Sequence, residues 1–355
     1  MNRAWWLLLT LGAVAGHADQ LPPSTKLQWY RGNTHTHTIN ADGNVTADAV
    51  VRWYREHGYQ FVVLTEHEHI VDVEPLNALF ASKERFLVMP GQEVTQMLLD
   101  DTHPEGRRHA HVNGIGLTRL TMPMGGAGDV FTARGVSMSQ TYMRNLAAIR
   151  SAGALPQVNH PNGRWSVRPS DLADISGVFL LEIWNGNPKS NNLGGTSERG
   201  EISLSTEGLW DAILSAGKTA WGVAADDSHD YRNLDNLRSE RPGMAWIVVR
   251  AAELTPKALM DSMYRGDFYA STGVALEDYS ADKAGIKIVI QQPPDPRGVD
   301  DSRFMTRFIG KNGTVLAETP GRTPSYTFRG DEGYVRASIL DSNGLRAWTQ
   351  PAFLK

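Results

Sequence analysis

The chain has 355 residues, so it is too long for a minimal binding module and suits one large domain, or one large and one small domain. Its formal net charge of -4 and its ordinary apolar content give no sign of a nucleic-acid-binding protein or of a protein held at an anionic membrane surface. It contains no cysteine, which excludes a disulfide-stabilised scaffold and a lipid anchor attached to cysteine.

The first residues have the pattern of a secretory signal peptide. A charged start at residues 1–3 precedes an apolar run at residues 4–15, and the small residues Gly16 and Ala18 predict cleavage before Asp19. A membrane anchor is the alternative, but the apolar run is shorter than the ~20 residues that a helix needs to cross a bilayer. We therefore expect removal of residues 1–18 and a mature protein in a bacterial periplasm or outside the cell, without a membrane anchor.

Helical and strand patterns then alternate along the chain. Apolar residues at helical spacing predict helices over residues 46–58, 75–85, 139–153 and 207–217. Unbroken apolar runs predict strands over residues 59–64, 86–90, 154–161, 178–185 and 219–229. This alternation indicates parallel strands joined by crossover helices, and α/β folds of this kind carry their chemistry at the carboxyl ends of the strands.

Beyond about residue 280 the pattern changes. Residues 286–290 alternate apolar and polar side chains, and Asn312-Gly313 and Asn343-Gly344 are typical of tight turns between antiparallel strands. We therefore expect an α/β domain over residues 19–280 and a small antiparallel β domain, similar to a β-sandwich, over residues 281–355.

Histidines and carboxylates gather at or just after the ends of the predicted strands. His35 and His37 alternate along a strand, so their imidazoles share one face and could hold one metal ion. The complete set is His35, His37, Asp42, His67, Glu93, His111, His160, Asp227 and His229. A single histidine of this set could be structural, but six of the chain's eleven histidines on one rim indicate a metal centre.

This set has too many donors for one tetrahedral zinc ion, which takes four ligands. It fits two or three divalent ions, zinc, manganese or iron, with Glu93 as a bridging carboxylate. Two such ions can hold a bridging hydroxide and neutralise the charge that grows as it attacks, which is hydrolase chemistry. Asp227 could also accept a proton from the metal-bound water. Arg164 and Asn185 could contact a substrate oxygen, although a solvated arginine and a turn-forming asparagine are equally good interpretations.

In chain order these motifs resemble the polymerase and histidinol phosphatase (PHP) family. They are His35-Thr36-His37, Asp42-Gly43, Thr65-Glu66-His67, Gly91-Gln92-Glu93, His111, His160-Pro161 and Asp227-Ser228-His229, within about residues 28–273. The resemblance implies a distorted (β/α)7 barrel, a trinuclear site with the nine residues as ligands, and hydrolysis of phosphate esters. Residues 264–273 and 347–351 are similar to the exported, carbaryl-hydrolase-like branch of the family, in which carbamate esters are also cleaved.

Two positions require a choice between neighbours. The family usually has aspartate where this chain has Glu66, so we expect Glu66 to support a ligand rather than to be one. His109 would share a strand face with His111, but residues 112–114 match the family best after His111.

We therefore expect an exported, metal-dependent phosphoesterase with a small-molecule phosphate ester as substrate and no nucleic-acid partner. The first alternative is a carboxylic ester, carbamate or amide hydrolase that uses the same site. The second is a non-catalytic surface-binding protein in which the β domain recognises a partner. The intact ligand set argues against this second alternative.

Overall fold

The computed structural model describes residues 26–82, 85–122, 132–133, 136–200, 202–292 and 303–354. The predicted signal peptide lies outside these residues. Within these ranges no helix is both long and apolar enough to cross a lipid bilayer.

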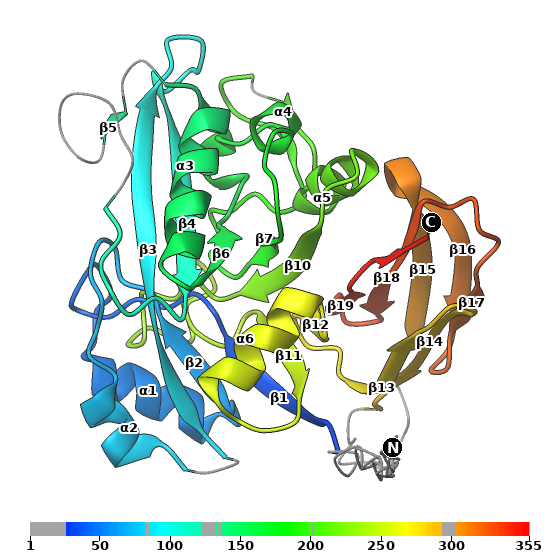
Figure 1. Cartoon of the computed structure of the whole chain (residues 1–355), viewed down its shortest axis with the longest axis horizontal. Helices are drawn as coiled ribbons and strands as arrows, with labels where there is room; N and C mark the ends of the chain where they lie inside the picture. Colours follow the sequence, from blue (N-terminus) through cyan, green and yellow to red (C-terminus); the bar gives the residue numbers. More distant parts are fainter. Residues whose placement is uncertain are drawn as a thin grey trace, which may run out of the picture.

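One large mixed sheet runs through the molecule (Figure 1). Its strands follow the order β10-β7-β6-β4-β3-β2-β1-β11-β12-β19-β18-β15-β16, with β5 beside β3 and β20 beside β18. In the α/β part these are β1 (Gln28–Asn33), β2 (Phe61–Leu64), β3 (Leu87–Leu99), β4 (Arg107–Ile115), β5 (Thr132–Ala133), β6 (Leu155–Val158), β7 (Phe179–Asn185), β10 (Ala220–Ala225), β11 (Trp246–Ala251) and β12 (Phe268–Ser271). A separate small hairpin joins β8 (Gly195–Thr196) and β9 (Ile202–Ser203).

Helices accompany the strands of the α/β part. They are α1 (Ala47–Glu56), α2 (Glu74–Phe80), α3 (Met138–Ser151), α4 (Pro169–Leu172), α5 (Thr206–Ser215) and α6 (Pro256–Arg265), with a short 3₁₀ turn at Gly163–Trp165. α1 forms because Val50, Val51 and Tyr54 recur at helical spacing and pack into one buried cluster with the side chains of β2. α3 begins at Ser137, whose hydroxyl accepts a hydrogen bond from the amide of Gln140 in a capping box.

The strand pairing differs from the parallel alternation that the sequence predicted at β4, and also at β11 and β12, where β11 is antiparallel to β1 and β12 to β11. β1, β2 and β3 pair in parallel, as do β6, β7 and β10, but β4 is antiparallel to both β3 and β6. The cause is that β3 does not end at residue 90 but continues to Leu99 and turns back directly into β4. Glu93 and His111 therefore lie inside strands and not at strand ends, which corrects that part of the prediction.

The segments that follow β1 and β10 lie side by side. Thr36 and Ser228, which follow β1 and β10, form an isolated parallel bridge, and the amide of His37 donates a hydrogen bond to the carbonyl of Ser228 at 3.1 Å. β1 and β10 themselves are not neighbours in the strand order. The structure is thus a mixed α/β fold in which the segments after β1 and β10 come together.

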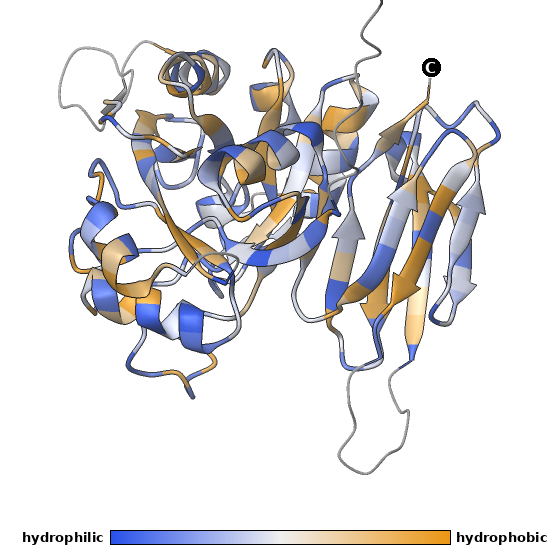
Figure 2. Ribbon diagram, turned by 60° about the horizontal axis from the view of Figure 1, so that its bottom comes forward, coloured by the Kyte–Doolittle hydropathy of each residue, from blue (hydrophilic) through white to orange (hydrophobic). Residues whose placement is uncertain are grey.

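The C-terminal strands form two facing layers. One is the three-stranded sheet of β13 (Leu276–Ala281), β14 (Gly285–Ile290) and β17 (Ser325–Thr327). The other continues the large sheet through β15 (Phe304–Gly310), β16 (Thr314–Pro320), β18 (Tyr334–Asp341), β19 (Arg346–Thr349) and β20 (Ala352–Phe353). Figure 2 shows apolar positions on these strands, and Ile286, Ile288 and Ile290 of β14 pack with Phe308 and Ile339 of the second layer. The alternation predicted for residues 286–290 thus buries one face of β14, while β13 starts before the expected boundary at residue 281.

Candidate metal centre

Strand register brings the predicted ligands together. β2 and β3 pair with Leu64 opposite Pro90, so three residues further along His67 forms a bridge with Glu93. The nine predicted ligands fall into four overlapping groups whose donor atoms lie within 4.8 Å of one another. The groups are His37, Asp42, His67 and His229; His35, His37 and Glu93; His35, His160 and Asp227; and Glu93, His111 and His160.

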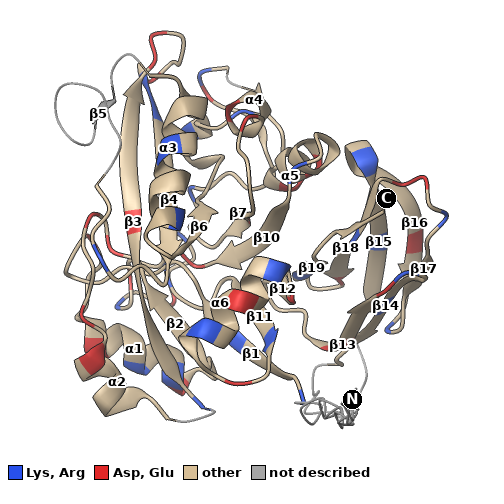
Figure 3. Cartoon of the chain, viewed as in Figure 1, with Lys and Arg blue, Asp and Glu red and all other residues tan. Residues whose placement is uncertain are grey.

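The carboxylate of Glu93 lies at the middle of this cluster. Glu93 is the only acidic residue of β3, and Figure 3 shows that acidic position midway along the strand. Its Oε2 lies 3.2 Å from Nε2 of His35 and 3.3 Å from both Nε2 of His37 and Nδ1 of His67. Its Oε1 lies 3.1 Å from Nδ1 of His111 and 3.3 Å from Nε2 of His160. One buried carboxylate thus contacts five imidazoles and presents an oxygen to each side of the cluster, as a bridging ligand does.

The other two carboxylates lie at different depths. Asp227 is buried, with Oδ1 at 3.2 Å from Nε2 of His35 and at 3.3 Å from Nε2 of His37. Asp42 lies at the opening, 57% exposed, with Oδ1 at 3.2 Å from Nε2 of His229. Gly43 makes this position possible, because a Cβ atom there would lie 2.6 Å from the carbonyl oxygen of His37. The predicted Asp-Gly turn therefore folds directly onto the strand that carries the first two histidines.

Left-handed backbone aims two of the predicted ligands inward. His160 and Asp227 have φ angles of 23° and 52°, a region that costs non-glycine residues about 1–3 kcal/mol each. The amide of His160 donates to Oε2 of Glu182 at 2.6 Å, and the amide of Asp227 donates to the carbonyl of His35 at 3.0 Å. These hydrogen bonds hold both turns in place at the ends of β6 and β10.

Glu182 is the main supporting residue behind the cluster. It is fully buried, and its Oε1 lies 2.7 Å from Nδ1 of His35 and accepts a hydrogen bond from Gln157 at 3.0 Å. Its Oε2 accepts from the amide of His160 and from the side chain of Asn185. The contact with Nδ1 turns the other ring nitrogen of His35 towards Glu93 and Asp227. A lone acid in the apolar strand Phe179–Asn185 was the available sequence signal, but it is equally typical of an acid that binds a loop amide.

Asparagines complete this support. The side-chain amide of Asn159 donates to Oε1 of Glu93 and to Oδ1 of Asn113, both at 2.8 Å. Asn185 donates to Oδ2 of Asp227 at 3.2 Å and does not line the opening above the cluster. The structure therefore places Asn185 behind Asp227, and not in the position of a substrate contact. Sequence analysis did not single out Asn159, although its place beside His160 at a strand end was a usable signal.

The remaining sequence candidates lie around the cluster. Glu66 is buried outside the four donor groups, and its Oε2 accepts a hydrogen bond from the amide of Thr38 at 3.1 Å. His109 also lies outside these groups and forms part of the cavity wall beside His111. Arg164 lines the same cavity, with its guanidinium 3.3 Å from Glu105.

A cavity of about 320 Å³ opens above the cluster. Besides the predicted ligands, its polar lining includes residues that sequence analysis did not single out: Asn187, Lys189, Ser190 and Glu240. Lys189 contacts Glu240 at 2.8 Å, and Glu240 in turn lies 3.4 Å from Nδ1 of His229. The opening therefore joins the cluster to a polar pocket that a small molecule can enter.

The electrostatics of the cluster are those of a cation-binding site. Burial lowers the pKa of His67, but the carboxylates of Glu93 and Asp42 raise it to about 9. Burial likewise lowers the pKa of His229, and the carboxylates of Asp42 and Asp227 raise it to about 9. Burial raises the pKa of Asp227, yet His35 and the other imidazoles hold it well below its usual range. The carboxylates are thus negatively charged at neutral pH and stabilise positive charge on the imidazoles around them.

Some of the buried donor nitrogens make no hydrogen bond, which also suits a metal site. Nδ1 of His37 and Nε2 of His111 are buried and have no hydrogen-bond partner in the part of the chain that the structure describes, and Nε2 of His37 faces only the carboxylates of Glu93 and Asp227. Buried polar atoms normally have partners, so these nitrogens are free to bind an ion. Mixed imidazole and carboxylate donors suit zinc, manganese or iron.

No protein-family model matches the chain, and no curated protein matches it. Among solved structures, a two-domain protein of Bacteroides vulgatus that contains a predicted PHP-like metal-dependent phosphoesterase aligns with 96% of this chain and 100% of its own, at 15% identity and a TM-score of 0.48. A provisionally assigned metal-dependent phosphoesterase of Bifidobacterium adolescentis aligns with 59% of this chain and 90% of its own, at 15% identity and a TM-score of 0.35. An amidohydrolase of Chromobacterium violaceum, with bound sulfate and no metal, aligns with 57% of this chain and 88% of its own, at 13% identity and a TM-score of 0.34.

Proposed function

We propose that the chain is a metal-dependent hydrolase of the PHP type and that its substrates are small phosphate esters. The observation that carries this proposal is the convergence of six imidazoles on three carboxylates below an open cavity, with Glu93 between them. Such a donor set fits two or three divalent ions.

Divalent ions held there would lower the pKa of a water molecule and offset negative charge on the attacked group. The protein's own residues have separate tasks. Glu93 would bridge, His35 is oriented by Glu182, and Asp227 would take up the proton of the water at a carboxylate oxygen. Asp227 is ionised at neutral pH, and because its lowered pKa makes it a weak base, this proton transfer would depend on the ions first making the water more acidic.

The charge around the opening supports a phosphate ester over a neutral ester. Arg164 and Lys189 line the cavity, and their side chains are 56% and 79% exposed. Exposed ion pairs such as theirs, with Glu105 and Glu240, are worth little, so both cations are free to turn towards an anionic substrate. Arginine in particular binds phosphate oxygens through paired N–H donors.

Three finer parts of the proposal rest on the sequence. The order of the motifs from His35 to His229 supports a distorted (β/α)7 barrel, in which the contact between Thr36 and Ser228 would mark its closure. Residues 264–273 and 347–351 support the carbaryl-hydrolase-like branch, and the pattern of residues 1–18 supports export to the periplasm or the medium.

A substrate panel tests the reaction. The purified chain, loaded with manganese or zinc, is assayed against a nitrophenyl phosphate, a bis-nitrophenyl phosphate and a naphthyl carbamate, with Glu93→Gln as the matched control. We expect metal-dependent release of nitrophenol from a phosphate ester and at least a ~100-fold loss in the variant. Product from the carbamate alone would move the reaction to carbon. No product from any ester at full metal occupancy would favour a non-catalytic binding protein.

A further inference from the structure

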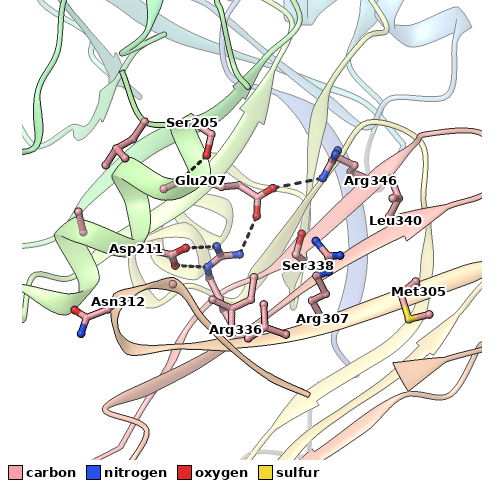
Figure 4. Close-up of a pocket in the computed structure, with 16 residues that line it drawn as sticks. Ser205, Glu207, Asp211, Met305, Arg307, Asn312, Arg336, Ser338, Leu340 and Arg346 are labelled. Carbon is pink, nitrogen blue, oxygen red and sulfur yellow. Dashed lines mark hydrogen bonds and ion pairs between the residues drawn. The ribbon is translucent and has the colours of Figure 1, made fainter. Parts of the chain in front are cut away.

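A second cavity lies between α5 and the sheet face of β15, β18 and β19 (Figure 4). It has a volume of about 660 Å³ and shares no lining residue with the cavity of the metal centre. This volume is in the range of pockets that bind small molecules.

The base of this cavity is a closed ion-pair network. Arg336 is buried, and its Nε and Nη2 donate to the two carboxylate oxygens of Asp211 at 2.8 and 2.7 Å. Its Nη1 donates to Glu207 at 3.2 Å. These partners compensate the charge of Arg336, which therefore forms the base of the cavity and leaves ligand binding to other groups.

Ser338 lies next to this ion-pair network but is not part of it. The residue as a whole is only 8% exposed, but its hydroxyl faces the cavity and makes no hydrogen bond with any residue that the structure describes. Figure 4 shows this hydroxyl between the side chains of Arg307 and Arg346. A hydroxyl on the wall of a cavity can donate a hydrogen bond to a ligand that enters it.

Strand register explains why two arginines flank this serine. Arg307 of β15 lies directly opposite Ser338 of β18, and Arg346 of β19 lies opposite Leu340, two residues further along. Neighbouring strands are about 4.8 Å apart, so the two arginines stand on either side of the middle strand and can both reach over it.

The charges leave room for one negative group. The lining contains three arginines and two acids, Glu207 and Asp211, which leaves one positive charge. Arg307 also contacts Glu318 at 2.7 Å outside the lining, but both side chains are about half exposed, at 59% and 48%, so this pair is weak. Arg346 contacts Glu207 only loosely, at 3.6 Å. A monoanion that takes the place of Glu318 beside Arg307 would keep the three arginines in balance with three negative charges, whereas a phosphate dianion would exceed it.

Apolar side chains surround this polar centre. Leu204, Met305, Val315 and Leu340 line the cavity and are 52%, 39%, 47% and 39% exposed. Exposed apolar side chains gathered around a pocket are typical of a surface that a ligand covers.

We propose that this cavity binds an organic carboxylate. The carboxylate accepts hydrogen bonds from the hydroxyl of Ser338 and from the guanidinium groups of Arg307 and Arg346. The apolar body of the ligand lies against Met305 and Leu340. This inference is independent of the proposed hydrolase activity, because no metal-centre residue takes part in it.

Calorimetric titration of the full chain with 4-phenylbutyrate tests the proposal, with the neutral 4-phenylbutanamide as the matched ligand. We expect the carboxylate to bind about tenfold more tightly than the amide, as the loss of charge-assisted hydrogen bonds implies. Arg307→Gln and Ser338→Leu should each weaken carboxylate binding about fivefold or more. Arg329→Gln is the control, because Arg329 is similarly exposed, at 61%, and lies outside the cavity.

Four results would overturn the proposal. They are no binding of 4-phenylbutyrate, equal binding of the amide, unchanged binding in both cavity variants, or loss of binding in Glu93→Gln, which would place the probe at the metal centre. Circular dichroism of each variant confirms that it is folded, and Arg307 is exposed enough that its replacement leaves the core intact.

Discussion

Nδ1 of His35 lies 2.7 Å from Oε1 of Glu182, and both side chains are completely buried. A carboxylate that accepts a hydrogen bond from one imidazole nitrogen fixes the direction of the other nitrogen. In this chain the other nitrogen, Nε2, lies 3.2 Å from both Glu93 and Asp227. The orientation of His35 therefore depends on a residue that does not itself belong to any of the donor groups.

Replacing Glu182 by glutamine should weaken metal binding. The carboxylate faces donors at both oxygens, so the amide group of glutamine would meet a hydrogen-bond donor on one side. We expect a ~10–100-fold loss of metal affinity in Glu182→Gln, measured by competition with a chelator. The exposed Glu318→Gln carries the same chemical change and should leave the affinity unchanged. Equal affinity in both variants would show that Glu182 does not orient His35.

His111 and His109 should respond differently to the same replacement. Nδ1 of His111 lies 3.1 Å from Glu93, whereas His109 joins none of the donor groups. His111→Gln should lower metal affinity about tenfold or more, and His109→Gln should leave the metal content of the purified protein unchanged. The reverse pattern in elemental analysis would make His109 the ligand.

The metal-free chain should lose stability as the pH rises. The folded-state pKa of His67 and of His229 is raised to about 9, above the ordinary value of 6.5. The stability that these groups contribute is therefore complete below about pH 6.5 and is lost as the pH rises through about 9. Thermal unfolding of chelator-treated protein should show a falling midpoint over this window, and a smaller fall in the His67→Gln, His229→Gln double variant.

Metal should reverse this trend, because imidazoles bind a metal ion only when they are deprotonated. The stabilisation by added manganese or zinc is expected to grow from pH 6.5 to pH 9. A midpoint of the metal-free chain that rises over the same window would contradict the pairing of these imidazoles with carboxylates.

The ion pair between Arg336 and Asp211 should matter for stability. Among the residues that the structure describes, Arg336→Met leaves the charge of Asp211 with only the hydroxyl of Tyr334 as a close side-chain partner, at 2.8 Å. Loss of one partner of a buried pair costs about 3–5 kcal/mol of unfolding free energy, measured by urea denaturation. Arg307→Gln, which breaks an exposed pair, should cost at most about 1 kcal/mol. A cost below about 1 kcal/mol for Arg336→Met would show that the pair does not hold α5 to β18.

Local pattern in the sequence was enough to predict α1, α2, α3 and α5, the main parallel strands of the α/β part and the convergence of the candidate ligands. Val50, Val51 and Tyr54 identify α1 by spacing alone, and alternation puts His35 and His37 on one face. Their meeting with Asp227 follows from the rule that parallel strands present their carboxyl ends on the same rim.

What the sequence did not predict depends on contacts between distant segments. An apolar run does not reveal whether β3 ends at residue 90 or continues into a hairpin, and this choice puts Glu93 opposite Asn113. Glu182 and Asn159 have roles only because register brings them to His35 and Glu93. In the same way, the second cavity exists because α5 packs against β18 through Asp211 and Arg336.

Elemental analysis of the purified wild-type chain and of Glu93→Gln tests the central claim most directly. The convergence of nine donors around Glu93 predicts at least two divalent ions per wild-type chain, and loss of most of this metal together with ester hydrolysis in the variant. Less than one ion per folded wild-type chain, or an unchanged metal content in Glu93→Gln, would contradict it.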